Sequence, residues 1–203
     1  MTFIRRISAF VTAWIFPVMF ASPVVHAGPV SSDARPAVQD GRHDFDFWFG
    51  RWAVKNRRML KPLSGLDEWE RFDATVECRP ILGGMGNEDE FLSPHRPGAI
   101  GMSLRFFDPA TRQWSIYWID NKMGVLLPPV VGHFVSGTGV FEGPDTLGGK
   151  PIDVRYTWSK TDTPTPQWEQ AFSVDGGKTW ETNWFMTMSR LPSQPATGKE
   201  GAL

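Results

Sequence analysis

The stretch His43–Trp52 constrains the fold of this chain more than any other part of the sequence. It is a short aromatic turn, His-Asp-Phe-Asp-Phe-Trp-Phe, followed by Gly50, Arg51 and Trp52 at the start of a predicted strand. Glycine adopts backbone conformations that other residues resist, and tryptophan supplies a large apolar plug with one N–H that needs a partner. This arrangement is typical of a turn that closes one end of an antiparallel β-barrel.

Short runs of aromatic and β-branched residues alternate with turn clusters from His43 to Leu191, and helical spacing is almost absent. Such a pattern predicts an all-β fold, and with the closing turn we expect a single antiparallel barrel of about eight to ten strands. Turns are expected at Asp108–Thr111, Glu142–Asp145 and Gly148–Lys150. The predicted strands are Trp52–Leu60, Trp69–Arg79, Asn87–Leu92, Ile100–Phe107, Gln113–Asp120, Val130–Val135, Gly139–Glu142, Ile152–Ser159, Trp168–Val174 and Glu181–Arg190.

Side chains in these strands alternate between an apolar face and a face that mixes polar and aromatic groups. The sequence leaves open which face lines the lumen. In the strand 100–107, for example, one face carries Met102, Leu104 and Phe106, and the other carries Ser103, Arg105 and Phe107.

Ser173–Trp180 resembles the Asp-box hairpin, Ser-x-Asp-x-Gly-x-Thr-Trp. We expect Asp175 to cap backbone donors of the turn and Trp180 to cover the base of the hairpin. Asp and Gly have ordinary turn chemistry, so the motif indicates local structure and no activity.

The first 27 residues have the pattern of a secretory signal peptide. A basic start (Arg5, Arg6) precedes a mostly apolar run, Ile7–Phe20, and Val25-His26-Ala27 offers a cleavage site after Ala27; an uncleaved membrane anchor is the alternative. We therefore expect a signal peptide (1–27), a flexible leader (28–42), the barrel (43–191) and a disordered tail (192–203). The protein is expected to be secreted or periplasmic, without stable membrane insertion after cleavage.

The cysteine and charge counts narrow the class of protein further. The one cysteine, Cys78, lies far from the cleavage point, so neither a lipid anchor nor an internal disulfide is expected. Without Arg5 and Arg6 the chain has 19 Lys and Arg against 22 Asp and Glu. This mild acidity argues against a nucleic-acid partner, and the sequence does not indicate an oligomeric state.

Several blocks resemble the DUF1579-type proteins, an uncharacterised bacterial family. The likeness covers about residues 43–191, and it implies a lipocalin-like, calycin-type barrel without a known reaction or cofactor. The blocks that carry it are Phe45–Trp52, Glu77–Gly84, Arg105–Pro109, Trp114–Trp118 and Trp180–Trp184.

Candidate ligand-binding residues are those that strand alternation could direct into a lumen. Glu90, facing Arg105 or Arg155, would form a buried pair that orients a polar ligand group or tunes an acid. Trp118 and Trp158 are the candidate aromatic walls, since aromatic faces bind flat or sugar-like ligands well.

Metal and cofactor signatures are missing from the sequence. No His-x-x-x-His or Cys-x-x-Cys spacing occurs, so we expect no metal site and no cofactor. His133 on a predicted strand is a conceivable haem ligand, although a lone strand histidine is more often structural.

These features favour a barrel that binds a small, partly apolar molecule in its lumen rather than an enzyme. Two alternatives remain open: an enzyme that uses a lumen carboxylate and arginine for acid–base chemistry, and a structural or partner-binding barrel with a filled lumen. Two or more convergent ionisable groups in a cavity would favour the enzyme. For the closure, we expect Arg190 to lie over Trp52 near Gly50 and to donate to carbonyls of residues 47–49.

Overall fold

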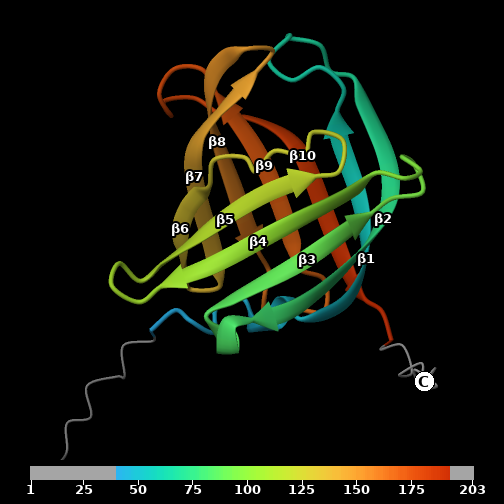
Figure 1. Ribbon diagram of the computed structural model, residues 1–203. Helices are drawn as coiled ribbons and strands as arrows, with labels where there is room; N and C mark the ends of the chain where they lie inside the picture. Colours follow the sequence, from blue (N-terminus) through green and yellow to red (C-terminus); the bar gives the residue numbers. More distant parts are fainter. Residues whose placement is uncertain (1–39, 193–203) are drawn as a thin grey trace, which may run out of the picture. The chain divides into compact units, whose positions relative to one another are not determined.

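Ten antiparallel strands form a closed β-barrel in the computed structural model, which describes residues 40–192 (Figure 1). The predicted signal peptide, most of the leader and the tail from residue 193 lie outside the described residues. The elements are η1 (Asp46–Trp48), β1 (Gly50–Met59), β2 (Trp69–Ile81), η2 (Leu82–Gly84), β3 (Gly86–Leu92), β4 (Ile100–Asp108), β5 (Gln113–Asp120), β6 (Val130–Val135), β7 (Thr138–Leu147), β8 (Lys150–Ser159), β9 (Gln167–Ser173) and β10 (Glu181–Arg190).

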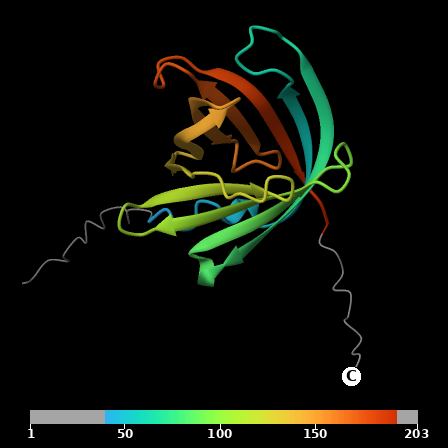
Figure 2. The ribbon, with the colours of Figure 1, turned by 45° about the horizontal axis from the view of Figure 1, so that its top comes forward.

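The strand order is that of an up-and-down barrel, because each strand pairs with the next and β1 pairs with β10. One end, called the mouth, carries the loops 60–68, 93–99, 121–129, 148–149 and 174–180 (Figure 2). The other end, called the closed end, carries η1. The prediction of an all-β, single antiparallel barrel is confirmed, with ten strands.

All ten strands occur where they were predicted, but β7 is longer than expected. The predicted turn Glu142–Asp145 is wrong, because these residues continue β7 and pair with β8. Pairing between β6 and β7 stops at Val131 and Glu142, so Pro144 lies beyond the end of β6. A proline is tolerated there because β7 has a partner strand on one side only at this position.

The strands differ in which of their two faces lines the lumen. In β5, β8 and β10 the apolar face points inward, as the buried Trp114, Ile152 and Met188 show. In β4 the order is reversed: Ser103 and Arg105 are buried, while Met102 and Leu104 are only half-buried on the outer face. The lumen therefore receives polar groups from β4 and large apolar groups from β5, β8 and β10.

The aromatic turn fills the closed end of the barrel. Phe45 is fully buried, and its ring lies 5.0 Å from the rings of Trp114 and Phe134. Trp48 stacks on Trp52 with ring centroids 5.0 Å apart, and Trp52 Nε1 donates to the Trp48 carbonyl oxygen at 2.8 Å. The closed end is thus packed with aromatic side chains.

Arg190 closes the barrel from the last strand. Trp52 and Arg190 are register partners in β1 and β10, and the guanidinium carbon lies 3.7 Å from the Trp52 ring centroid. Arg190 donates to the carbonyl oxygens of Phe47 and Phe49. Gly50 has φ of +99°, and a Cβ there would lie 3.0 Å from Arg190 Nη1. Gly50, Trp52 and Arg190 therefore lie in contact at the closed end, in the arrangement that the sequence led us to expect.

The hairpin between β9 and β10 has the expected Asp-box geometry. Asp175 accepts hydrogen bonds from the backbone N–H groups of Lys178 and Thr179 at 3.0 and 2.9 Å, and from the Thr179 hydroxyl at 2.6 Å. Trp180 Nε1 donates to the Gly177 carbonyl oxygen at 2.9 Å. These bonds, led by the Thr179 hydroxyl, lower the pKa of Asp175 to about 2.

Removing Arg190 should weaken the barrel. Arg190→Ala should lower the free energy of unfolding by about 1–2 kcal/mol, since it loses the stacked cation and the donors to two carbonyls. Arg190→Lys keeps the charge but not the planar guanidinium with its forked donors. Its free energy of unfolding should therefore lie between those of the wild type and Arg190→Ala. Urea melts measure this, with Lys55→Ala on the outer face of β1 as the control, expected below about 0.5 kcal/mol. In a double-mutant cycle with Trp52→Phe, additive effects would contradict the contact.

The Asp175 carboxylate should titrate with a pKa near 2, against an ordinary value of 3.8. Because the folded pKa is lowered, its stabilising effect is complete above about pH 4 and is lost as the pH falls through 2. Thermal melts of wild type and Asp175→Asn should therefore converge on acidification through this window. A constant difference in melting temperature down to pH 2 would contradict the capping role.

Candidate functional site

The barrel lumen contains a cavity of about 210 Å³ between the closed end and the mouth. Its wall is mainly apolar, with Phe91, Met186 and Met188 among the side chains that face it. The β5–β6 loop adds Met123 and Leu127. Five tryptophans from η1, β5, β8, β9 and β10 also line it: Trp48, Trp118, Trp158, Trp168 and Trp184.

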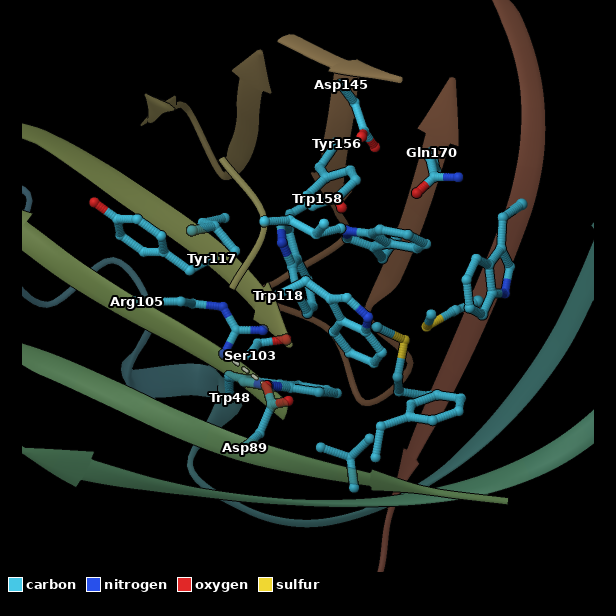
Figure 3. Close-up of a pocket in the computed structure, with 18 of the residues that line it drawn as sticks. Trp48, Asp89, Ser103, Arg105, Tyr117, Trp118, Asp145, Tyr156, Trp158 and Gln170 are labelled. Carbon is cyan, nitrogen blue, oxygen red and sulfur yellow. Dashed lines mark hydrogen bonds and ion pairs between the residues drawn. The ribbon is translucent and has the colours of Figure 1, made fainter. Parts of the chain in front are cut away.

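A buried ion pair lies at the deep end of this cavity (Figure 3). Arg105 Nη1 donates to Asp89 Oδ2 at 2.6 Å, and both side chains are only 4 % exposed. Asp89 Oδ2 also accepts from Trp48 Nε1 at 2.8 Å. Arg105 Nη1 further contacts Asn87 Oδ1 at 3.0 Å. The pair is therefore held in place by both the closing turn and β3.

Two buried donors on the cavity wall have no partner among residues 40–192. They are Arg105 Nε and Trp158 Nε1. Asn87 Nδ2, behind the ion pair, is a third donor without a partner in this part of the chain. A buried polar group without a hydrogen bond is costly and needs an explanation. An acceptor oxygen at the deep end would meet this need.

The wall across from the ion pair carries a second set of polar groups, Asp145, Tyr156 and Gln170 (Figure 3). Burial, and then the nearby Asp145 carboxylate, raise the pKa of Tyr156 well above its ordinary value, so its hydroxyl is protonated at neutral pH. Gln170 Nε2 donates to Asn183 Oδ1 at 2.9 Å. The amide oxygen of Gln170 therefore remains as its acceptor.

An outer cavity of about 450 Å³ lies nearer the mouth. Phe91, Trp118 and Trp184 line both cavities, so these three rings form the border between them. A Cβ at Gly101 would lie 2.2 Å from Trp118 Cη2, so only glycine on β4 lets the Trp118 indole lie there. The two cavities therefore adjoin at these three rings.

Charged side chains from β1, β2 and the β3–β4 loop gather at the mouth. Glu70 accepts hydrogen bonds from Arg58 and from His95 Nε2, the latter at 2.9 Å. Burial raises the pKa of Glu70, but the hydrogen bonds from His95 and Arg58 outweigh it, and the net pKa lies below the ordinary value. Arg58 also lies 5.0 Å from the Trp184 ring centroid. This cluster positions Trp184 at the border of the inner cavity.

Three of the five predicted lumen residues face the inner cavity: Arg105, Trp118 and Trp158. The prediction for Glu90 is wrong, because Glu90 is exposed on the outer face and Asp89 is the lumen carboxylate. The prediction for Arg155 is also wrong. Arg155 points outward, where it pairs with Glu142 at 2.6 Å and stacks on Trp180.

Both errors follow from strand alternation. Arg155 and Trp158 lie an odd number of residues apart on β8, so they cannot face the same side of the sheet. On β3, Glu88 and Glu90 share one face, so turning Glu90 into the lumen would bury two carboxylates. In the observed orientation Asp89 is the one carboxylate of β3 that is buried and needs a positively charged partner. Since charged groups are rarely buried unless paired, this difference was the available signal for Asp89. Nothing local in the sequence indicated the bond from Trp48.

A metal or haem site finds no support in residues 40–192. No group of three or more His, Cys, Asp or Glu side chains there could hold a metal ion. His133 is exposed on β6, so it does not face the lumen as a haem ligand would. Burial raises the pKa of the Cys78 thiol to about 12, so the thiol is protonated and unreactive at neutral pH.

None of the helices in residues 40–192 has the length and apolar character needed to cross a membrane.

Comparisons with known proteins find similarity among solved structures. No family model matches the chain, and no curated protein matches it. A solved structure, "Structure of S-type Phycobiliprotein Lyase CPES from Guillardia theta", is similar with a TM-score of 0.47 and 10 % sequence identity. The match covers 76 % of this chain and 97 % of that one. A likeness at this level assigns no function to the chain.

Breaking the lumen ion pair should cost far more stability than breaking a surface pair on the same strand. Asp89→Asn leaves Arg105 buried without a countercharge, and should lower the free energy of unfolding by about 3–5 kcal/mol. Glu88→Gln is the matched control, because Glu88 pairs with Arg79 on the outer face and should cost under about 1 kcal/mol. Equal losses in urea melts would contradict the buried role of Asp89.

Proposed function

We propose that this chain is an exported barrel that binds one small, partly apolar molecule in its lumen. The observation that carries the proposal is the 210 Å³ cavity, lined by five tryptophans, with a buried ion pair at its deep end. Binding sites for small molecules combine an apolar wall with a few placed polar groups in this way. A barrel with a completely filled lumen does not have such a cavity.

The cavity volume limits the size of the ligand. A dry cavity of about 150 Å³ accommodates a benzene ring, so the inner cavity suits a single ring with short substituents. Ring faces pack well against the indoles of Trp118, Trp158 and Trp184. A longer ligand would extend past these border rings into the outer cavity of about 450 Å³.

An enzyme is the second candidate, because more than one ionisable group converges on the cavity. Asp89, Arg105, Asp145 and Tyr156 all line it, and convergent groups of this kind are found at active sites. Against general acid–base work by Asp89, its Oδ2 already accepts two hydrogen bonds, from Trp48 and Arg105. Mass spectrometry of a bound ligand after prolonged incubation distinguishes the two, since a binding barrel returns it unchanged.

Export and family membership belong to the same proposal. Arg5, Arg6 and the apolar run Ile7–Phe20 support a signal peptide, and the aromatic blocks of the barrel support a place among the DUF1579-type proteins. Sequencing the exported protein should give Gly28 as its first residue. A mature protein that begins at Met1 would contradict periplasmic or secreted localisation.

The protein should bind small aromatic compounds through Trp118. Calorimetric titration with a panel of single-ring compounds should detect binding, and Trp118→Ala should weaken it by about tenfold through lost apolar contact. Trp69→Ala is the matched control, because Trp69 packs outside the barrel against Arg57 and Phe185. Unchanged affinity in Trp118→Ala, or no binding of any member of the panel, would contradict lumen binding.

A further inference from the structure

We infer that the lumen ligand is a neutral ring compound with a carbonyl-type oxygen at one end and a hydroxyl-type donor at the other, held with the carbonyl oxygen deep in the barrel. The inference rests on the proposed lumen binding and names the chemistry of its ligand. It follows from which hydrogen-bonding groups of the two cavity walls are still available.

The deep wall offers donors. Arg105 Nε and Trp158 Nε1 are buried without partners among residues 40–192, and the Arg105 guanidinium carbon lies 5.8 Å from the Trp158 ring centroid. Both residues line the inner cavity, so a ligand oxygen at its deep end is the kind of acceptor that these donors lack. An apolar ligand end would leave both donors without a hydrogen bond, which is unfavourable in a buried site.

The charge of the deep wall favours a neutral acceptor over a carboxylate. Arg105 is already neutralised by Asp89 at 2.6 Å, and Asp145 adds a further carboxylate to the same cavity. An anionic ligand would bring another negative charge into a buried space where Arg105, the only Lys or Arg among the lining residues of the described part of the chain, is already paired with Asp89, and this is strongly unfavourable. A carbonyl oxygen accepts the same hydrogen bonds without that charge.

The opposite wall offers acceptors. Asp145 Oδ1 accepts from the Thr146 N–H at 2.7 Å, which leaves its other oxygen for a ligand. Gln170 keeps its amide oxygen, because its nitrogen donates to Asn183. A hydroxyl or amine hydrogen on the ligand matches these groups, and the Tyr156 hydroxyl can either donate to it or accept from it.

Strand register sets the direction of the ligand. Trp158 is one residue from the closed end of β8, where it pairs with Trp168. Asp145 is near the mouth end of β7, two residues before the strand ends. Figure 3 shows Asp145, Tyr156 and Gln170 across the pocket from Asp89 and Arg105. The carbonyl end therefore enters first and the hydroxyl end faces the mouth.

Four single-ring probes test the inference by calorimetry at neutral pH: para-hydroxyacetophenone has both groups, acetophenone only the acceptor, para-ethylphenol only the donor, and para-hydroxybenzoate a charged acceptor. We expect para-hydroxyacetophenone to bind at least about tenfold more tightly than each of the other three. Equal affinities for the three neutral probes would overturn the inference while leaving lumen binding intact. Tightest binding of para-hydroxybenzoate would overturn the neutral ligand. No binding of any probe would count against the proposed function itself.

Two variants test which wall of the cavity each end of the ligand contacts. Trp158→Phe removes one deep donor and should weaken acetophenone about fivefold, without changing para-ethylphenol. Asp145→Asn should do the reverse, weakening para-ethylphenol and leaving acetophenone unchanged. Asp153→Asn on the outer face of β8 is the matched control for the lost charge and should change neither. Equal effects on both probes in either variant would contradict the proposed orientation.

Discussion

The barrel depends on one carboxylate oxygen, Asp89 Oδ2, which accepts hydrogen bonds from Trp48 at 2.8 Å and from Arg105 at 2.6 Å. Trp48 belongs to the closing turn and stacks on Trp52, over which Arg190 lies from the last strand. The contacts therefore run without interruption from the seam between β1 and β10 to the floor of the lumen. Barrel closure and the candidate binding site therefore share one continuous set of contacts.

A buried ion pair is weak evidence for stability, because well-packed apolar side chains of similar volume often stabilise a core as well or better. Its presence in a lumen with a mainly apolar wall supports the proposed recognition of a ligand. Asp89 holds the Arg105 guanidinium in one orientation, and the remaining Arg105 Nε and the nearby Trp158 Nε1 stay unpartnered. Donors without partners make the folded protein less stable. A ligand that supplies an acceptor removes this cost, so its binding becomes more favourable. We therefore take the polar floor as the feature on which function depends.

The architecture could be predicted from the sequence because it depends on local signals. The Gly50-Arg51-Trp52 turn, the aromatic strands and the Asp-box hairpin each specify their own geometry, and pairing Trp52 with Arg190 needs only the first and last strands. The lumen face could not be predicted, because it depends on pairing between strands. Asp89 faces inward through its register with Ser103 on β4, and β4 presents its polar side to the lumen. The continuation of β7 through Pro144 likewise depends on where β6 ends.

Methyl NMR of the methionines tests the central claim, a lumen that receives a single-ring ligand, most directly. Met186 and Met188 line the inner cavity, whereas Met102 lies on the outer face of β4. On titration with para-hydroxyacetophenone, ring-current shifts and intermolecular contacts should appear at the methyl groups of Met186 and Met188 and be absent at Met102. Contacts at Met102, or unperturbed Met186 and Met188 methyl signals under saturating ligand, would contradict binding in the lumen.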